Sequence, residues 1–264
     1  MKILRFAINK TIKYGVLEGD RIRAMLGTPY SYFRKPSGPL RLTQNTYKLN
    51  EVRLLAPCLP SKIVALGLNY RSHAEETKLQ IPSVPLIFLK PSTAAIGPED
   101  KIVYPKVSKR VDYEGELAVV IGRKARAVDR AKAKEYVLGY TCFNDVSARY
   151  EQRDDVQWTR SKSYDTFAPI GPYIETAISP DDLKLETYLN GELRQSAWTS
   201  DLIFPVDALV SFISSVMTLL PGDVIATGTT SGIGPMKPGD VVEVKIEGIG
   251  TLRNYVVAQT SKIE

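Results

Sequence analysis

The segment VDYEGELAVVIG, residues 111–122, most constrains what this chain can fold into. It begins with three alternate acidic residues, Asp112, Glu114 and Glu116, and is then almost wholly apolar over residues 117–121. Alternate side chains of a β-strand point to the same face, so one strand would carry the three carboxylates together. The apolar run that follows is typical of a strand that enters a core. The segment therefore predicts a buried strand with an acidic end.

A second acidic position, Asp145, follows Asn144 at the end of the apolar run LGYTCF. Carboxylates gathered at the ends of buried strands form a hard-oxygen site, which suits Mg²⁺ or Mn²⁺ better than zinc. The alternative is a solvated edge strand, but such a face usually mixes lysine or threonine with its acids. The pattern predicts a divalent-metal site.

The remaining composition excludes several classes of protein. The chain of 264 residues is long enough for one large domain, or for one domain and a small lobe. Its net charge of +6 is spread along the chain without a basic helix that carries interleaved aromatics, so we expect no nucleic-acid partner. No apolar run is long enough to span a membrane, and the start MKILRFAINK does not resemble a signal peptide. Two cysteines in apolar surroundings, Cys58 and Cys142, favour reduced thiols and a cytoplasmic protein.

Short strand-like runs and turn signals predict a small N-terminal β lobe at residues 1–57 and a catalytic domain at residues 58–264. The second part has many strand-like runs and few helical ones, without regular alternation, so we expect a mainly β (α+β) fold and disfavour a doubly wound sheet. Asn190–Gly191 predicts a hairpin turn. Helices are predicted at 129–137, where Asp129 can cap, and at 206–219. In the second helix, the following apolar residues are predicted to face the core: Leu209, Val210, Ile213, Val216, Met217 and Leu220.

His73 is the only histidine of the chain, and Glu76 follows three residues later. In a helical turn the two would share a face, and a carboxylate beside an imidazole makes a general base. The alternative is a surface histidine in a short polar helix.

Several other polar residues are candidates for a site, although each has an ordinary structural explanation. Lys90 and Lys162 would place cations beside strands that enter a core, or they could be surface lysines that extend into solvent. A helix that starts near Val146 would put Asp145, Arg149 and Gln152 on one side, as would an ordinary polar helix face.

The loop ATGTTSGIGPMKPGD is rich in glycine and follows a predicted strand. Gly228 and its neighbours could present backbone N–H groups, and Thr229 a hydroxyl, to a carboxylate. The loop has neither the GK[ST] ending of a P-loop nor the helix that follows a dinucleotide-binding fingerprint. Turn geometry alone would also explain its glycines.

Taken in order, seven segments of the chain resemble the fumarylacetoacetate hydrolase family: GLNYRSHAEE, PLIFLKPSTA, VDYEGELAVVIG, YTCFNDVSAR, RSKSYDTFAPIGP, YLNGELRQ and ATGTTSGIGPMKPGD. The resemblance extends from about residue 57 to the C-terminus. The N-terminal lobe is similar to the short extension of the bacterial branch that includes 2-hydroxyhepta-2,4-diene-1,7-dioate isomerases and acylpyruvate hydrolases. The resemblance implies a mixed β-roll with a few flanking helices, usually dimeric.

The resemblance also implies roles for individual residues. It makes Glu114, Glu116 and Asp145 the ligands of Mg²⁺ or Mn²⁺, and His73 and Glu76 a water-activating pair on a segment that acts as a lid. The remaining positions contact the substrate or assist the reaction: Lys162, Thr229, Gly228, Arg149, Gln152 and Lys90.

The expected substrate is a small anionic 2-oxo acid or its enol. Hydrolytic C–C cleavage of an acylpyruvate is the favoured reaction, and the presence of both the histidine and the glutamate favours hydrolysis or decarboxylation over isomerisation. Isomerisation of a 2-hydroxydienoate and decarboxylation of oxaloacetate are the alternatives. A binding protein on the same fold, without catalysis, is a more remote one.

Overall fold

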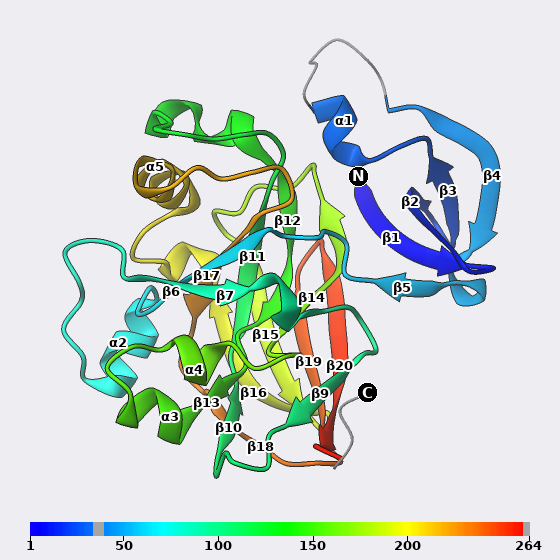
Figure 1. The fold of residues 1–264 in the computed structure, drawn as a ribbon. Coiled ribbons are helices and arrows are strands. Elements are labelled where there is room, and N and C mark those ends of the chain that lie inside the picture. Colours follow the sequence, from blue (N-terminus) through cyan, green and yellow to red (C-terminus); the bar gives the residue numbers. More distant parts are fainter. Residues whose placement is uncertain (34–39, 261–264) are drawn as a thin grey trace.

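The strands of this computed structural model form three sheets over the residues that the structure describes, 1–33 and 40–260. Helices are few and short, and they flank the sheets (Figure 1). The predicted mainly β architecture is confirmed. No helix among these residues is long and apolar enough to cross a membrane.

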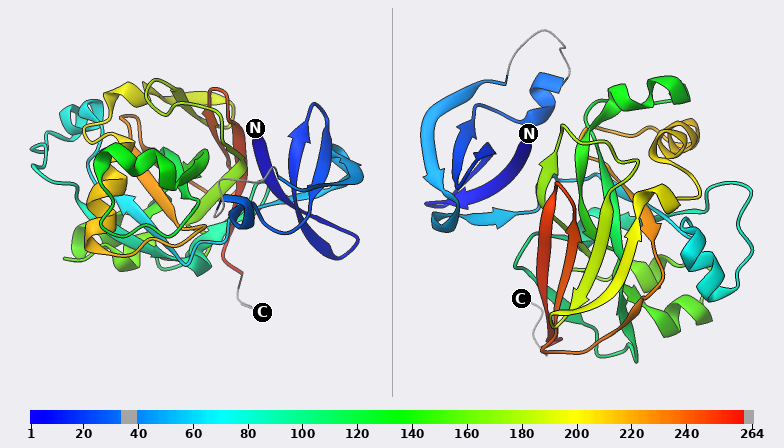
Figure 2. Two further views of the ribbon diagram at one scale, coloured as in Figure 1. Left: turned by 90° about the horizontal axis from the view of Figure 1, so that it is seen from above. Right: turned by 180° about the vertical axis from the view of Figure 1, so that it is seen from behind.

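The largest sheet has twelve strands, and it includes strands of both the N-terminal part and the main body of the protein. Its strands, in spatial order, are β4 (Leu42–Lys48), β3 (Arg21–Met25), β2 (Thr11–Glu18), β1 (Lys2–Ile8), β14 (Ala168–Glu175), β12 (Val137–Asn144), β11 (Gly115–Ile121), β17 (Val224–Thr229), β6 (Lys62–Leu66) and β7 (Ile87–Pro91), while β5 (Arg53–Leu55) pairs with β1 and β8 (Ala95–Ile96) with β14. The N-terminal strands lie beside the main body in every view (Figures 1 and 2). They connect to it through the register Lys2↔Glu175 and Ile3↔Ile174.

Two smaller sheets complete the β structure. The five-stranded sheet contains β16 (Glu192–Trp198), β15 (Lys184–Leu189), β19 (Val241–Ile246), β20 (Gly250–Ala258) and β9 (Lys101–Tyr104), and the three-stranded sheet contains β13 (Ser147–Ala148), β10 (Val111–Tyr113) and β18 (Gly234–Met236). The predicted hairpin at Asn190–Gly191 joins β15 to β16, and both turn residues have positive φ, 53° and 80°. Such a two-residue turn requires positive φ at both positions, which asparagine and glycine tolerate best.

The helical elements differ from prediction mainly in type and length. They are α1 (Pro29–Phe33), α2 (Arg71–Thr77), α3 (Arg149–Asp154), α4 (Thr159–Lys162) and α5 (Val206–Val216), with 3₁₀ turns η1 (Leu49–Glu51), η2 (Ser92–Ala94), η3 (Arg130–Tyr136) and η4 (Thr199–Asp201). The helix predicted at 129–137 is the 3₁₀ segment η3, although Asp129 caps it as expected by accepting from the Ala131 N–H at 2.9 Å. Ala133 is the residue of η3 that is buried, so little apolar packing is present to favour a regular α-helix.

The C-terminal part of the helix predicted at 206–219 is not helical. The backbone of Leu219 pairs in both directions with Ala125 at 2.9 Å, which draws the chain out of the helix after Val216. Val216 and Leu220 are consequently 56% and 41% exposed, so their assignment to the core was wrong.

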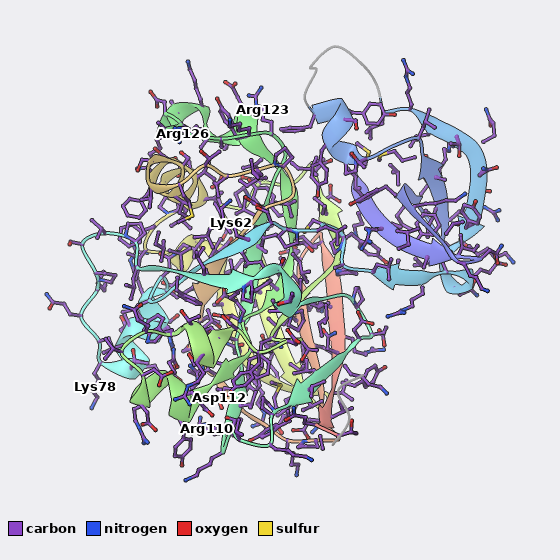
Figure 3. All side chains as sticks on the ribbon, in the orientation of Figure 1. Lys62, Lys78, Arg110, Asp112, Arg123 and Arg126 are labelled. Carbon is purple, nitrogen blue, oxygen red and sulfur yellow. The ribbon has the colours of Figure 1, made fainter. Side chains whose placement is uncertain are left out.

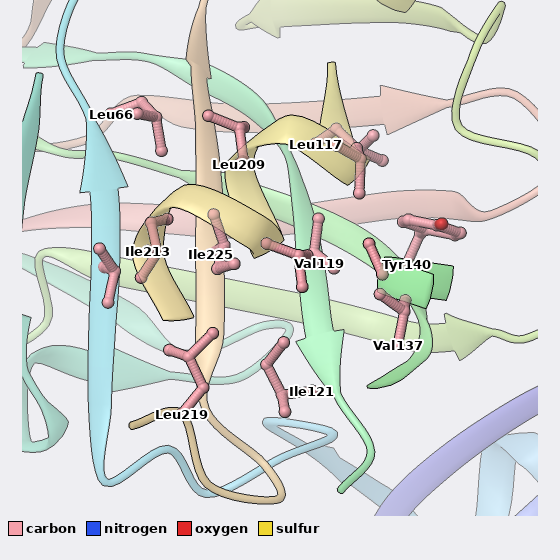
Figure 4. Packing of buried hydrophobic residues seen from close by; sticks show 14 of the residues in the cluster. Leu66, Leu117, Val119, Ile121, Val137, Tyr140, Leu209, Ile213, Leu219 and Ile225 are labelled. Carbon is pink, nitrogen blue, oxygen red and sulfur yellow. The ribbon is translucent and has the colours of Figure 1, made fainter. Parts of the chain in front are cut away.

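Strand β11 forms the centre of the core, and all seven of its residues are buried. Leu117, Val119 and Ile121 pack on the side of α5, whereas Ala118 and Val120 enter the cluster on the opposite face. Figure 4 shows α5 across the sheet, with its side chains directed at β11 and β17. Because both faces of β11 are covered, its sequence is continuously apolar rather than alternating.

The buried strand predicted from the segment 111–122 is interrupted at Glu114. The Glu114 N–H donates to the Asn144 side chain and the Gly115 N–H to the Gln195 side chain, both at 2.9 Å. These two side chains take the place of ladder partners, so β10 and β11 belong to different sheets. Asp112 therefore lies outside the cluster of carboxylates that Glu114 and Glu116 form with Asp145.

Candidate active site

Three buried carboxylates converge where β11 begins and β12 ends. Ligand oxygens of Glu114, Glu116 and Asp145 all lie within 4.8 Å of one another. The register Gly115↔Asn144 of the antiparallel pair β11 and β12 places the start of one strand beside the end of the other. The Asp145 N–H then donates to the Glu114 carbonyl at 2.8 Å, which fixes the two acidic residues side by side.

Three cations surround these carboxylates, and two of them, the lysines, are buried. Lys162 Nζ donates to Glu114 Oε2 at 2.9 Å and to Asp145 Oδ2 at 2.6 Å. Lys90 forms an ion pair with Asp145, and Arg149 with Glu114. Both lysines are almost fully buried, so neither of them extends into solvent.

The charges around Glu114 and the lysines determine their ionisation. Burial would raise the pKa of the Glu114 carboxyl, but Lys162 and Arg149 together hold that pKa well below its usual range. Burial would lower the pKa of Lys162, but Asp145 and Glu114 raise it above its usual value. For Lys90 burial prevails over the ion pair with Asp145, and its pKa is lowered.

Glu116 differs from the other two carboxylates because a backbone N–H, rather than a lysine or arginine, donates to it. Its Oε2 accepts from the Gly228 N–H at 2.8 Å, and its Oε1 is buried without a hydrogen-bond partner among the described residues. Burial, and then the charges of Asp145 and Glu114, raise the pKa of Glu116 well above the usual value. A buried carboxylate oxygen without a partner is costly unless a cation or proton meets it. The donor set and this oxygen fit a hard divalent cation such as Mg²⁺ or Mn²⁺.

The glycine-rich loop holds this cluster from the side of β17. Gly228 has φ +95°, and a Cβ there would lie 2.8 Å from the Cβ of Asn69, so only glycine fits. Its N–H is already used by Glu116, which makes Gly228 a support for the carboxylate. Thr229 donates to the Gly115 carbonyl at 3.0 Å and lines the adjoining cavity.

His73 and Glu76 lie on the short helix α2, and both carry the contacts that the spacing predicts. His73 Nδ1 and Glu76 Oε2 are 3.1 Å apart, and the other oxygen of Glu76 accepts from the Gly232 N–H at 3.1 Å. With Nδ1–H directed to the carboxylate, Nε2 is the basic nitrogen of the ring. At the start of α2, Ser72 donates its N–H and its hydroxyl to Asp201 Oδ2, at 3.1 and 2.7 Å.

A cavity of about 900 Å³ connects these elements, and six of the predicted residues line it: His73, Glu114, Arg149, Gln152, Lys162 and Thr229. Leu86, Phe88 and Trp158 form an apolar part of its wall. Other predicted residues lie behind the lining: Glu116 and Asp145 beside Glu114, Lys90 on Asp145, Gly228 on Glu116 and Glu76 on His73.

Helix α3 begins at Arg149, later than predicted, because the chain first forms β13. Arg149 makes three contacts: it donates to Asp112 at 2.8 Å, to the side-chain oxygen Oε1 of Gln152 at 2.7 Å, and to Glu114. Asp112 also pairs with Arg110 at 2.8 Å, next to it in Figure 3. Asp112 thus positions Arg149 instead of joining the cluster of three carboxylates.

Sequence reasoning missed Gln195 and Asp201. Gln195 is buried, accepts from the Gly115 N–H, and donates to the Thr229 hydroxyl at 2.8 Å and to the Thr230 carbonyl at 3.0 Å. It lies in β16, after the hairpin turn, where an alternating strand gives no sign that one of its polar residues is buried. Asp201 lies in η4 and acts on α2, more than a hundred positions away in the chain.

In comparisons with known proteins, two family models match separate parts of the chain. Residues 62–257 match the family model described as fumarylacetoacetate (FAA) hydrolase C-terminal, and residues 1–57 match the model Rv2993c-like, N-terminal. The chain is 46% identical over 260 residues to Protein Rv2993c of Mycobacterium tuberculosis. The aligned region covers 97% of this chain and 98% of that protein. It is 40% identical over 220 residues to the mitochondrial oxaloacetate tautomerase Fahd2a of Rattus norvegicus, covering 79% of this chain and 70% of the relative.

Solved structures share the whole fold. A 5-carboxymethyl-2-hydroxymuconate delta-isomerase from Mycobacterium smegmatis superposes with a TM-score of 0.91 at 45% identity, covering 98% of this chain and all of that chain. A maleylpyruvate hydrolase from Sphingobium sp. SYK-6, in complex with manganese(II) and pyruvate, has a TM-score of 0.83 at 33% identity with the same coverage. This chain belongs to the fumarylacetoacetate hydrolase family.

Proposed function

We propose that this protein is an enzyme that depends on Mg²⁺ or Mn²⁺ and moves a proton on a 2-oxo dicarboxylic acid, by keto–enol tautomerisation or by shift of a double bond. The observation that carries the proposal is one cavity lined by both His73 and Glu114, which belongs to the carboxylate cluster. A divalent cation held by the cluster could anchor the anionic end of a 2-oxo acid while a base acts on the adjacent carbon.

Each residue would contribute a distinct step. A divalent cation held by Glu114, Glu116 and Asp145 would supply Lewis-acid stabilisation of negative charge on the substrate oxygens. His73 Nε2 accepts the proton from the carbon next to the 2-oxo group, because Glu76 stabilises the imidazolium that results. The same imidazolium returns the proton to the oxygen or to another carbon. Arg149 is fixed by its three contacts, so it holds Glu114 in place without rearrangement.

Relatives support proton transfer as the first candidate. The proteins named as an isomerase and a tautomerase are 45% and 40% identical to this chain, whereas the maleylpyruvate hydrolase is 33% identical. The three named reactions share an enolate of a 2-oxo acid, so a common site can serve all of them.

Hydrolytic C–C cleavage of an acylpyruvate is the second candidate, and the paired His73 and Glu76 favour it. An imidazole that is held by a carboxylate can activate water as readily as it accepts a carbon-bound proton. The cavity of about 900 Å³ has room for both a substrate and a water molecule.

Proton exchange in heavy water separates the candidates. Oxaloacetate, 2-hydroxyhepta-2,4-dienedioate and acetylpyruvate are incubated with the protein and Mg²⁺, Mn²⁺ or EDTA, and followed by NMR. Metal-dependent deuterium incorporation without chain cleavage is expected. Release of pyruvate from acetylpyruvate would replace the first candidate by the second, and no reaction with any metal would reject both.

A further inference from the structure

The cations that line the cavity are not equally available to a ligand. Lys162 is shared between Glu114 and Asp145, and Arg149 uses all three of its guanidinium nitrogens on neighbouring side chains. Both are therefore committed to the carboxylates that they hold in place.

Arg153 also lines the cavity but has much weaker attachments. Its Nε donates to Asp154, the adjacent residue, at 3.0 Å, and its guanidinium lies 5.0 Å from the centre of the Tyr150 ring. Its two terminal nitrogens have no partner among the residues that the structure describes. An ion pair between adjacent exposed side chains, here 71% and 56% exposed, stabilises little and exchanges readily.

The position of Arg153 on α3 gives it a defined relation to the carboxylate cluster. Arg149 and Arg153 are four residues apart, so they lie on the same face of α3, separated by about 6 Å along the helix axis. Arg149 contacts Glu114 at the deep end, and Arg153 stands one turn farther out. A short dicarboxylate anchored at the cluster would extend its second carboxylate toward Arg153.

We propose that Arg153 binds the distal carboxylate of the substrate and selects 2-oxo dicarboxylic acids over 2-oxo monocarboxylic acids. The inference rests on the proposed function, because that function supplies the anchored end of the substrate. A guanidinium can take a carboxylate with two parallel hydrogen bonds, which gives it both affinity and orientation. Arg153 is then a residue for specificity that acts at a distance from the reacting carbon.

The test uses two acids that differ only at the distal group: oxaloacetate carries a carboxylate where 2-oxobutanoate carries a methyl. Deuterium exchange at carbon 3 is measured with Mg²⁺ for the unmodified protein, Arg153→Gln and Arg153→Lys. Arg160→Gln is the matched control, because Arg160 is an exposed arginine of α4 that pairs with Asp155 at 2.7 Å. Calorimetric titration of both acids measures selectivity without catalysis.

Arg153→Gln should raise KM and Kd for oxaloacetate about tenfold, the usual scale for losing one charge-assisted contact at a partly exposed site. Its kcat, and all values for 2-oxobutanoate, should stay within about twofold. Arg153→Lys should recover part of the loss, and Arg160→Gln should behave as the unmodified protein.

Equal changes for the two acids, or none, would overturn the role of Arg153. Selective binding that depends on Arg153 but without exchange would reject the proposed reaction and keep the specificity. Failure of the unmodified protein to prefer oxaloacetate in either assay would reject the specificity itself.

Discussion

The deep end of the cavity and its mouth differ in the secondary structure that carries their side chains and in how far those side chains are buried. Directly behind the deep end, Glu116, Asp145 and Lys90 sit on or directly after strands of the central sheet and have 0% exposure. At the mouth, Glu76 and Arg153 lie on short helices, and their side chains are 40% and 71% exposed. The deep end is held by the sheet, whereas the mouth depends on a few side-chain contacts.

This difference separates binding from reactivity. Carboxylates fixed by strand register keep their spacing whether or not a ligand is present, as a metal site requires. Groups on a short helix can shift when a substrate enters, which suits a base and a residue for specificity. Changes at the deep end should therefore remove function or stability outright, and changes at the mouth should alter rates by graded amounts.

The largest effect is expected from Glu116→Gln at the deep end. Removing one ligand charge should lower the affinity for Mg²⁺ and Mn²⁺ by more than about 100-fold. Loss of a residue that only hydrogen-bonds a metal ligand already lowers metal affinity about 10- to 100-fold. Calorimetric titration measures the affinity, and oxaloacetate exchange should fall to background. Glu135→Gln, at an exposed glutamate that pairs with Arg123, is the control and should bind metal normally. Unchanged metal affinity in Glu116→Gln would mean that the cluster is not the metal site.

At the mouth, His73→Ala should lower kcat about 10²- to 10⁴-fold, the usual range for losing a general base. Oxalate affinity in the presence of metal should hardly change, because the cluster and not His73 would hold that ligand. Glu76→Gln should lose much of the same rate, and the double variant should lose no more than His73→Ala, since Glu76 acts through the imidazole. Strictly additive losses would show that the two residues work independently.

The parts of the site that local patterns determine could be predicted from the sequence. Glu114 and Glu116 are two positions apart in one strand-like segment, and His73 and Glu76 are separated by one helical turn, so short-range geometry brings each pair together. The hairpin turn at Asn190–Gly191 was predicted correctly, because its two residues alone determine such a turn.

The missing parts depend on contacts between distant segments. The interruption at Glu114 arises because Asn144 and Gln195 bond the backbone there, 30 and 80 positions away. Neither partner can be identified from the local pattern of β10 and β11. The early end of α5 has the same origin, because the backbone pairing of Leu219 with Ala125 prevails over helix propensity.

Lys90→Met tests how firmly the deep end is held. Removing this lysine leaves Asp145 with Lys162 alone, and breaking a buried ion pair on one side should cost about 3 kcal/mol of unfolding free energy. Urea unfolding in EDTA measures the loss, and added Mg²⁺ should restore part of it by compensating the carboxylate charge. Arg130→Met, which removes an exposed ion pair with Asp207, should leave the unfolding midpoint nearly unchanged. Equal losses in the two variants would contradict the assigned difference between buried and exposed pairs.

The smallest effect is expected from Ser72→Ala, which loosens the mouth without touching the deep end. It removes the hydroxyl that donates to Asp201 at 2.7 Å and lies 3.2 Å from the Thr230 hydroxyl, while the Ser72 N–H bond to Asp201 remains. The loss of such a partly buried bond is worth about 1 kcal/mol. Because α2 is one short helix held otherwise by Arg71 on the Asp201 and Leu202 carbonyls and by Glu76 on the Gly232 N–H, this free energy should appear locally, as faster amide exchange over Arg71–Thr77 with an unchanged global unfolding midpoint.

The same variant should lower kcat less than tenfold and leave metal and oxalate affinity as they are, because His73 is still present but less often in place. Ser215→Ala is the control. It removes a hydroxyl that donates to the Phe212 carbonyl on the exposed side of α5, and it should change neither amide exchange in α2 nor kcat. If Ser72→Ala lowered metal affinity as well, the mouth and the deep end would be one cooperative unit. The two regions would then differ in exposure alone, and not in what they contribute to function.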